Sequence, residues 1–216
     1  MLSWDHNAYY HGALLRRLPK HARRVLDVGC GVGHLAARLA ERADHVDAVD
    51  VDADMVNAAK ALVPANVTCW QADIMKDHLP PASYDAIVSV SALHHVDLQP
   101  ALVRFADALR PGGVIVAIAL PKVDLPRELP VELAATVVHH LLGIVLVSTR
   151  HRWRVGLPHP AHPGSMPIKD PVLTTRQVRS SARAVLPSAE VRRLLLWRYL
   201  LTWRKPNLRD FRDTGN

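Results

Sequence analysis

Residues 25–33 read VLDVGCGVG, an apolar run that leads directly into three closely spaced glycines. A short apolar run bounded by glycine is typical of a buried strand that ends in a tight turn. Residues 35–40 then carry apolar side chains at helical spacing, so an amphipathic helix is expected after the turn. Because glycine lacks a side chain and tolerates positive φ, such a turn lets a ligand approach the backbone closely.

Further apolar runs alternate with helical patterns along the chain. The elements expected before residue 121 are helices at residues 7–18, 35–40, 55–63 and 101–109 and further strands at 45–51, 67–71, 86–90 and 114–120. Near the C-terminus, Thr174 or Thr175 is expected to cap a helix, followed by two closely joined strands at residues 190–197 and 199–204. This alternation predicts an α/β fold: an open, doubly wound sheet with right-handed crossovers and helices on both faces.

The spacing of the three glycines distinguishes two classes of nucleotide ligand. Dinucleotide-binding turns follow the pattern G-x-G-x-x-G, in which the helix N-terminus faces a pyrophosphate. Here Gly29, Gly31 and Gly33 follow the pattern G-x-G-x-G, and His34 stands where the dinucleotide pattern requires its third glycine. The turn therefore favours a nucleoside without a pyrophosphate over NAD.

A carboxylate at the end of the second strand supports a nucleoside ligand. Asp50 follows Gly33 by 17 residues, and a carboxylate at such a strand end accepts hydrogen bonds from the ribose hydroxyls of a bound nucleoside. Of the neighbouring aspartates, Asp47 is expected to face solvent, whereas Asp52 and Asp54 fit a helix cap and a first helical turn. Asp50 is therefore the predicted ribose ligand.

Several segments in a fixed order give the chain a resemblance to a known enzyme family. They read LDVGCGVG (26–33), VDVD (49–52), QADI (71–74), YDAIVS (84–89) with ALHHV (92–96), and LRPGG (109–113). This arrangement resembles the class I S-adenosylmethionine (SAM)-dependent methyltransferases and spans residues 25–120, over 40% of the chain. The resemblance implies SAM as the cofactor and a seven-stranded, mostly parallel sheet whose last strand is antiparallel.

The resemblance also implies roles for individual residues. The glycines would surround the methionyl part of SAM, and the first aspartate of the turn would orient the turn and the ammonium group of the cofactor. The other positions would hold the ribose and the adenine and line the cofactor after the fourth strand. In chain order the implied contacts are Asp27, Gly29, Gly31, Gly33, Asp50 for the ribose, Val51 and Asp73 for the adenine, and Val90.

The chain length is that of one domain. We expect a single methyltransferase domain over residues 1–216, with an N-terminal cap helix at 1–22 and a SAM-binding core at 23–120. Residues 121–175 are expected to form a variable, substrate-covering insertion of helix and loop after the fifth strand. Residues 176–216 would supply the final helix and the strand pair.

Two histidines follow the fourth strand, beside the expected position of the transferred methyl group. A hydroxyl acceptor must lose a proton, and an imidazole that is neutral near pH 7 is suited to take it. His95 is the first candidate for a general base, because similar enzymes often carry a histidine at this position, and His94 is the second. The alternative is that either imidazole is a structural group bonded to the backbone.

Aromatic residues of the N-terminal helix are candidate substrate contacts. In comparable enzymes such a helix folds over the cofactor, so Tyr9 or Tyr10 is a candidate to close the pocket. The alternative is that Trp4 and the tyrosines dock the helix on the sheet. No metal site is expected, because neither Cys30 and Cys69 nor the histidines at positions 139, 140, 151, 159 and 162 have a recognised ligand spacing.

The net charge of +7 is spread unevenly along the chain. Residues 1–120 carry 11 Lys and Arg against 13 Asp and Glu, whereas residues 121–216 carry 16 against 7. A solvated basic face explains this asymmetry more simply than nucleic acid, because the motifs of adenine N-methylation and cytosine C5-methylation are missing after strand four. With no basic region followed by an apolar run at the N-terminus, a cytoplasmic location is expected.

The predicted function is therefore methyl transfer from SAM to oxygen or nitrogen of a small-molecule acceptor, whose identity the sequence does not indicate. A rival is a lipid or quinone methyltransferase in peripheral contact with a membrane, since the very apolar residues 129–147 precede Arg150, Arg152 and Arg154. A second rival is a SAM-binding protein that transfers no methyl group. The sequence gives no indication of oligomeric state.

Overall fold

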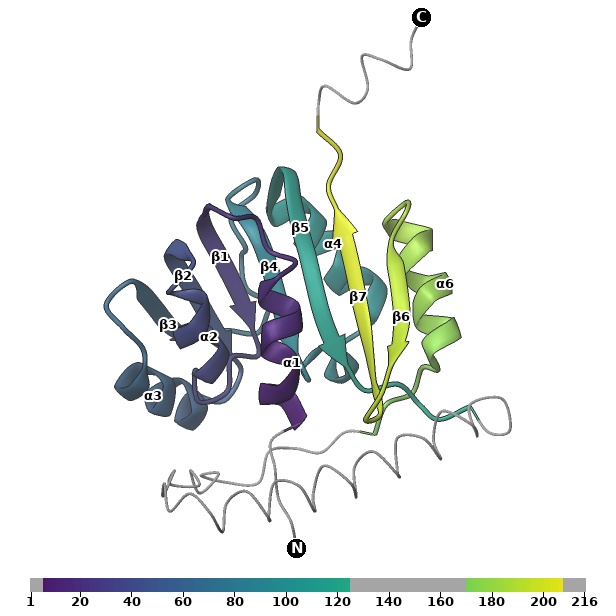
Figure 1. The fold of residues 1–216 in the computed structure, drawn as a ribbon, viewed down its shortest axis with the longest axis horizontal. Helices are drawn as coiled ribbons and strands as arrows, with labels where there is room; N and C mark the ends of the chain where they lie inside the picture. Colours follow the sequence, from purple (N-terminus) through teal and green to yellow (C-terminus); the bar gives the residue numbers. More distant parts are fainter. Residues whose placement is uncertain (1–5, 125–169, 208–216) are drawn as a thin grey trace, which may run out of the picture.

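One twisted, seven-stranded sheet forms the centre of the computed structural model, which describes residues 6–124 and 170–207 (Figure 1). Six strands run parallel, and β7 lies antiparallel to both of its neighbours. The strands lie in the order β3-β2-β1-β4-β5-β7-β6. They are β1 (Ala22–Val28), β2 (Ala43–Asp50), β3 (Val67–Gln71), β4 (Tyr84–Val90), β5 (Leu109–Ala119), β6 (Glu190–Leu194) and β7 (Arg198–Arg204). The doubly wound sheet with an antiparallel last strand is confirmed.

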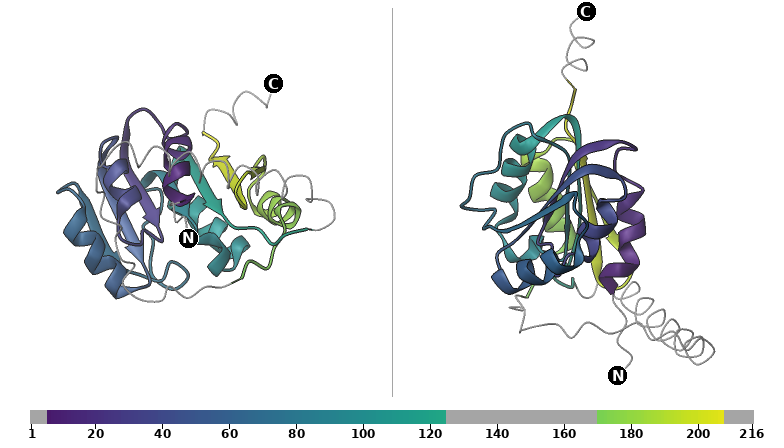
Figure 2. Two further views of the ribbon diagram at one scale, coloured as in Figure 1. Left: turned by 60° about the horizontal axis from the view of Figure 1, so that its bottom comes forward. Right: turned by 90° about the vertical axis from the view of Figure 1, so that its left-hand side faces the viewer.

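Helices cover both faces of the sheet (Figures 1 and 2). On one face lie α1 (His6–Leu15), α2 (His34–Leu39) and α3 (Ala53–Leu62). On the other lie α4 (Leu98–Ala108) and α6 (Thr175–Val185), together with the short 3-10 helix η1 (Leu93–His95). A parallel sheet buried on both sides in this way requires strands that are apolar on both faces.

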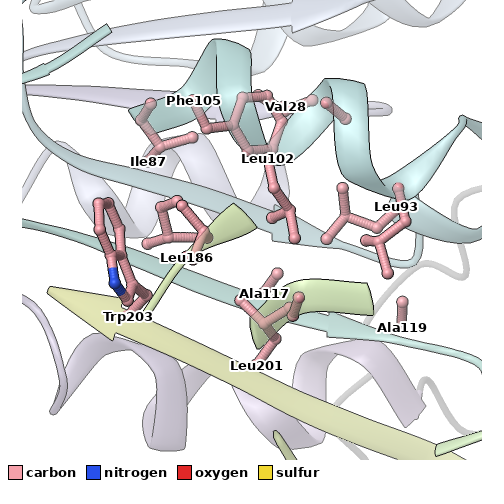
Figure 3. Close-up of a cluster of buried hydrophobic side chains, with 14 of the residues drawn as sticks. Val28, Ile87, Leu93, Leu102, Phe105, Ala117, Ala119, Leu186, Leu201 and Trp203 are labelled. Atoms are coloured by element: carbon pink, nitrogen blue, oxygen red, sulfur yellow. The ribbon is translucent and has the colours of Figure 1, made fainter. Parts of the chain in front are cut away.

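The two faces hold two separate apolar cores. Along β5, Val116 and Ile118 pack in the core under α1, α2 and α3, whereas Ala117 and Ala119 pack in the core under α4 and α6. Figure 3 shows part of this second core, in which Phe105 of α4 is fully buried. The uninterrupted apolar sequence of β5 follows from burial on both faces.

Two of the predicted helix caps are present. Asp52 precedes α3, and its carboxylate accepts hydrogen bonds from the backbone amides of Asp54 at 2.8 Å and Met55 at 3.4 Å. Thr174 precedes α6 and forms a reciprocal capping box with Gln177. Each cap satisfies backbone donors that the first helical turn leaves unpaired.

Arginines of α6 cover the edge of the sheet. Arg179 donates two hydrogen bonds to the carbonyl of Val191 in the edge strand β6, at 3.1 and 2.8 Å, and Arg183 donates one to Ala189 at 3.1 Å. A covered edge offers fewer free carbonyls to a strand of another chain. Part of the basic excess of the C-terminal half is therefore used within the fold.

The expectation for Asp47 is wrong, because its side chain is buried and not solvent-facing. Asp47 is 1% exposed and lies 2.7 Å from the guanidinium of Arg24 and 3.1 Å from the imidazole of His45. Arg24 also lies over the ring of Tyr84, with its guanidinium carbon 5.2 Å from the ring centroid. Partners from neighbouring positions compensate the cost of burying this carboxylate.

Several strand boundaries differ from the prediction, and two of these differences have a clear structural reason. β5 begins at Leu109, because Leu109 pairs with Tyr84 before an irregularity in the β4–β5 register, so the Pro-Gly-Gly segment lies within the strand. β6 ends at Leu194, and the chain turns through Leu196 and Trp197, both with φ of 58°. Such bulky residues rarely adopt positive φ and give no turn signal in the sequence.

Some expectations fall on residues that the structure does not describe. The apolar helix expected at 129–147, most of the loop at 157–171, and the histidines at positions 139, 140, 151, 159 and 162 lie outside the described residues. Within residues 6–124 and 170–207, no helix combines the length and the apolar character needed to span a bilayer.

Candidate functional site

The carboxyl ends of the parallel strands meet at one edge of the sheet (Figure 1), and the predicted cofactor-binding residues lie at or just after the ends of β1, β2, β3 and β4. The strand order reverses between β1 and β4, because β1 continues in sequence to β2 on one side whereas β4 continues to β5 on the other. In open α/β sheets, ligands bind at such a switch point, outside the carboxyl ends of the strands.

The glycine turn leaves β1 at this switch point and is held by the neighbouring strand. The carbonyl of Val49 in β2 accepts hydrogen bonds from the amides of Gly29 at 2.8 Å and Cys30 at 3.0 Å. Gly29, Gly31 and Gly33 have φ of 71°, 52° and 86°. All three values lie in the left-handed region, which favours glycine.

The three glycines differ in what surrounds them. A Cβ on Gly29 would lie 2.3 Å from the Cβ of Ala92, and one on Gly33 would lie 2.9 Å from a methyl of Val63. A Cβ on Gly31 would meet no atom within 4 Å. Close packing thus accounts for two of the glycines, whereas Gly31 exposes its backbone to open space where a ligand can approach.

Asp50 lies beside Gly31 and is held in place by backbone amides. One carboxylate oxygen accepts a hydrogen bond from the Gly31 amide at 2.8 Å, and the other accepts one from the Asp52 amide at 3.0 Å. Asp50 is partly exposed, and each of its oxygens has a second lone pair for donors such as hydroxyl groups. The structure thus brings Asp50 and the glycine turn together.

Asp27 lies beneath the same turn and is almost completely buried. The residue is 1% exposed, and neither carboxylate oxygen has a hydrogen-bond partner among the described residues. Burial, followed by the nearby charge of Asp50, raises the pKa of Asp27 to about 7. A buried carboxyl group without partners carries a cost unless a ligand supplies a donor.

The two cysteines near the turn are buried and free. Burial raises the pKa of the Cys30 thiol above its usual range, and the charges of Asp27 and Asp50 raise it further. Burial also raises the pKa of Cys69. Because the thiolate is the reactive form, both groups are poor nucleophiles.

Val51 and Asp73 lie at the ends of β2 and β3, which are joined by hydrogen bonds. The amide of Ala72 donates to the carbonyl of Asp50 at 2.9 Å, and the side chain of Gln71 donates to the carbonyl of Val51 at 2.9 Å. Val51 is 60% exposed, an unusual position for a large apolar side chain. The open side chain of Val51 and the neighbouring Asp73 flank the Asp50 end of the site.

The carboxylate of Asp73 already has partners within the chain. It accepts a hydrogen bond from the amide of Met75 at 2.9 Å and pairs with Lys76 at 3.0 Å. The bond with Lys76, followed by the Met75 amide, lowers the pKa of Asp73. Asp73 is therefore ionised at neutral pH. Because its partner Lys76 is exposed, a ligand donor can take the place of Lys76 at the Asp73 carboxylate.

Val90 ends β4, and the two histidines follow it in η1. Ser91 follows Val90 with φ of 58°, and its amide donates to the carbonyl of Ile118 at 2.7 Å. The chain then enters η1, where the rings of His94 and His95 lie with their centroids 4.1 Å apart and their planes at 39°. Strained backbone of this kind is concentrated at functional sites.

A pocket opens beside η1. His94 lines it, whereas His95 is not among the described residues that do so. The other walls come from the ends of three strands, the start of α4, and α6 with the residues that precede it. They are Leu93, Val96, Leu98, Leu120, Pro171, Val172, Leu173, Val178 and Tyr199.

Sequence reasoning did not identify most of this pocket. Leu120 follows β5, Tyr199 is the second residue of β7 and Val172 precedes α6, so the three lie far apart in the chain. Tyr199 pairs with Ala119, which brings the start of β7 to the carboxyl end of β5. Only the register of the antiparallel strand reveals that contact, and no local motif signals it.

Tyr10 docks α1 on the sheet. Its side chain is 6% exposed within the core under α1, and its hydroxyl donates a hydrogen bond to the carbonyl of Leu195 in the β6–β7 turn. This geometry favours the docking interpretation for Tyr10. The side chain of Tyr9 lies outside the described part of the structure.

Within the described residues, no group of three or more His, Cys, Asp or Glu side chains is placed to hold a metal ion.

Comparisons with known proteins point to one kind of enzyme. Residues 25–113 match a family model described as a methyltransferase domain. An uncharacterized methyltransferase of Mycobacterium tuberculosis is 39% identical over 206 residues, which cover 94% of this chain and 98% of the relative. A ubiquinone biosynthesis O-methyltransferase of Xylella fastidiosa is 36% identical over 103 residues, covering 45% of this chain and 42% of the relative.

A solved structure shows the same fold at lower sequence identity. The SAM-dependent methyltransferase from Mesorhizobium loti is 21% identical, with a TM-score of 0.59. The match covers 90% of this chain and 96% of that one.

Proposed function

This chain belongs to the class I SAM-dependent methyltransferases, and we propose that it methylates an oxygen or nitrogen atom of a small molecule bound beside His94. The observation that carries the proposal is the position of His94. Its imidazole lines a pocket at the carboxyl edge of the sheet, next to the exit of β4. When bound, SAM supplies an activated methyl group; the protein aligns the acceptor and excludes water.

The residues of the glycine turn fit SAM as the cofactor. Gly31 leaves open space above its Cα, and the unpartnered oxygens of Asp27 offer acceptors for the ammonium group of SAM. In the proposed arrangement Asp27 and the turn from Gly29 to Gly33 hold the methionyl part. Asp50, already fixed by two amides, accepts the ribose hydroxyls.

The adenine is proposed to lie between the ends of β2 and β3. Val51 presents an exposed apolar surface for the flat face of the base, and Asp73 offers a carboxylate to its amino group. Val90 lines the cofactor at the end of β4, closest to the histidines. In this proposed arrangement the methyl group would point toward η1 and the pocket.

One of the two imidazoles is proposed to take the proton that a hydroxyl acceptor must lose. The family resemblance favours His95, whereas the pocket lining favours His94. The rings are in contact, with centroids 4.1 Å apart, so each also restrains the orientation of the other. The similarity of 45% of the chain to an O-methyltransferase supports oxygen as the acceptor atom.

The predicted substrate-covering insertion is proposed to close the acceptor site. Its two described ends lie side by side, because the amide of Lys122 donates to the carbonyl of Leu173 at 2.8 Å. The second end also contributes Pro171, Val172 and Leu173 to the pocket wall. The division into a cap helix at residues 1–22, a core at 23–120, an insertion at 121–175 and a final unit at 176–216 remains part of this proposal.

Isotope transfer tests the proposed function. The full chain is incubated with SAM labelled in its methyl group and with a cell extract divided into small-molecule, lipid, nucleic-acid and protein fractions. Label bound to oxygen or nitrogen of a small molecule supports the proposal. Label that accumulates only in another fraction overturns it, and so does SAM that stays intact with every fraction.

A further inference from the structure

The segment between β3 and β4 carries Asp73 without the support of a regular element. Residues 72–83 are all described, and they contain no helix or strand. A loop of this kind is more mobile than the elements it connects unless other contacts hold it. Because Asp73 lies near its start, the contacts that fix this segment also fix the proposed adenine contact.

Residues 73–77 form a turn that is closed by its own hydrogen bonds. The carbonyl of Asp73 accepts the amides of Lys76 at 2.9 Å and Asp77 at 2.8 Å. In return, the carboxylate of Asp77 accepts the amide of Asp73 at 2.8 Å, and the carboxylate of Asp73 accepts the amide of Met75 at 2.9 Å. The Asp73 carboxylate is therefore fixed relative to the rest of this 73–77 turn.

Arg104 of α4 binds the 73–77 turn through two backbone carbonyls. Its Nε donates to the carbonyl of Ile74 at 2.6 Å, and its Nη2 donates to the carbonyl of Asp77. The planar guanidinium holds these donors in a fixed geometry. α4 is itself anchored by Leu102 and Phe105, which are fully buried. Arg104 thus joins the turn to a well-packed helix.

The side chain of Ile74 is a second anchor of the turn. It is 5% exposed and packs in the core under α4 and α6. Apolar burial is not directional, whereas hydrogen bonds weaken steeply when their angles change. Burial of Ile74 therefore keeps the turn against the protein, and the bonds from Arg104 determine its orientation.

Lys76 is a weaker partner of the Asp73 carboxylate. The two groups lie 3.0 Å apart, but the side chain of Lys76 is 82% exposed, and an exposed ion pair contributes little to stability. The bond with Lys76 is the largest cause of the lowered pKa of Asp73, and the charge of Arg104 adds to it. When another donor replaces Lys76, the bonds within the turn and to Arg104 remain, because they involve other groups.

These contacts link Arg104 to the proposed adenine contact. An acceptor that is already in place binds its ligand more tightly than one that must first be ordered. We infer that Arg104 is a positioning residue for the cofactor, because it holds the 73–77 turn against α4 and so keeps the Asp73 carboxylate where the amino group of the base would bind, an inference that rests on the proposed function.

Arg104→Met tests this role, and Arg179→Met is its matched control. Methionine keeps an unbranched side chain and donates no hydrogen bond. Both arginines are partly buried on helices of the same face of the sheet, and each donates two hydrogen bonds to backbone carbonyl oxygens. Arg179, however, bonds Val191 in β6, at the opposite edge of the sheet from β3. A loss of stability is expected in both variants, and a loss of the adenine contact in only one.

Two ligands that differ in one amino group report on the Asp73 contact. They are S-adenosylhomocysteine, the demethylated product of SAM, and its 6-deamino analogue, in which hydrogen replaces the amino group of the base. Calorimetry with the full chain measures both affinities. The native protein and Arg179→Met are expected to prefer S-adenosylhomocysteine about tenfold, the contribution of one charge-assisted hydrogen bond. In Arg104→Met this preference is expected to fall to about threefold or less, because the acceptor must first be ordered.

A double-mutant cycle with Asp73→Ala separates positioning from general damage. If Arg104 acts through Asp73, Arg104→Met weakens S-adenosylhomocysteine binding in the native background and has little further effect in Asp73→Ala. An equal loss in both backgrounds overturns the inference, as does a native preference in Arg104→Met or an equally reduced preference in Arg179→Met. Should Arg104→Met not fold, Arg104→Gln replaces it. Glutamine is too short to reproduce both bonds, so a native preference in that variant also overturns the inference.

The outcome is separable from that of the proposed function. A native protein without preference for the amino group, or an Asp73→Ala variant that keeps the preference, overturns the proposed adenine contact and the role of Arg104 with it. A preference that depends on Asp73 but not on Arg104 overturns the role of Arg104 alone. A preference that depends on both residues, with no label transferred to a small molecule, supports the role of Arg104 and overturns the proposed methyl acceptor.

Discussion

The carboxylate of Asp50 accepts a hydrogen bond of 2.8 Å from the backbone amide of Gly31. This bond joins the end of β2 to the glycine turn after β1, across the point where the strand order reverses. It fixes a carboxylate beside the one glycine of the turn whose Cα faces open space. The proposed cofactor site is organised around this pair.

The glycines predict two different kinds of damage. Gly29→Ala and Gly31→Ala are each expected to lower the free energy of unfolding by about 1–2 kcal/mol, because a residue with a side chain is strained at positive φ. Gly29→Ala adds a clash with Ala92, which lowers the free energy of unfolding by about 1–3 kcal/mol more. Gly31→Ala meets no neighbour and is expected to weaken SAM binding instead. Denaturation and calorimetry on both variants check this contrast, and the reverse pattern contradicts it.

The buried carboxyl group of Asp27 predicts a dependence of stability on pH. Its pKa is raised from 3.8 to about 7 in the folded protein, so folding favours the protonated form. Its contribution to the free energy of unfolding is therefore greatest below about pH 4, falls as pH rises to about 7, and is constant above that. Denaturant unfolding of the native protein and of Asp27→Asn across this window measures the contribution as a difference. A difference that does not change with pH contradicts the assignment.

The same group predicts a pH dependence of cofactor affinity. If Asp27 binds the ammonium group of SAM, it must be ionised in the complex. The affinity for SAM then rises with pH by up to about tenfold per unit below pH 7 and levels off above it. Asp27→Asn should bind SAM more weakly and without this slope. Equal slopes for the two proteins in calorimetric titrations would remove Asp27 from the cofactor site.

The histidine pair predicts a loss of turnover without a loss of cofactor binding. Removing a general base typically lowers turnover by about 100-fold or more. His94→Gln and His95→Gln, assayed with the acceptor identified by isotope transfer, show which imidazole has this role. The affinity for SAM is expected to stay close to native in both variants. Native turnover in both rules out a histidine base.

Tyr10 predicts an effect on stability rather than on the site. Tyr10→Phe removes the hydrogen bond to the Leu195 carbonyl and keeps the ring in its apolar surroundings. The free energy of unfolding is expected to fall by about 1 kcal/mol, with SAM affinity unchanged. A variant of native stability with altered SAM affinity would instead support the pocket-closing alternative.

The parts of the fold that depend on local chemistry could be predicted from the sequence. Positive φ at a glycine turn, a capping aspartate at position 52 and a threonine cap at position 174 each follow from neighbouring residues. The doubly wound sheet with an antiparallel last strand followed from the alternation of strands and helices together with the family resemblance. Gly31 and Asp50 were singled out as candidates for the same reason, since the turn and the strand end each carry their own signal.

The features that could not be predicted depend on contacts between distant segments. Asp47 is buried because Arg24 of a neighbouring strand pairs with it, and the sequence around Asp47 carries no sign of that partner. Tyr199 reaches the pocket only through the register of β7 against β5. Ala92 explains why Gly29 has no side chain, but only the folded chain brings the two together.

A calorimetric titration of SAM tests the Gly31–Asp50 cofactor site most directly. Asp50→Asn removes the charge at the proposed ribose contact, and Asp54→Asn makes the same change at an exposed position in the first turn of α3. Native protein and Asp54→Asn should bind SAM equally, and Asp50→Asn should bind it about tenfold or more weakly, the loss of a charge-assisted hydrogen bond. Equal affinity in all three proteins, or no binding by the native protein, would contradict the account.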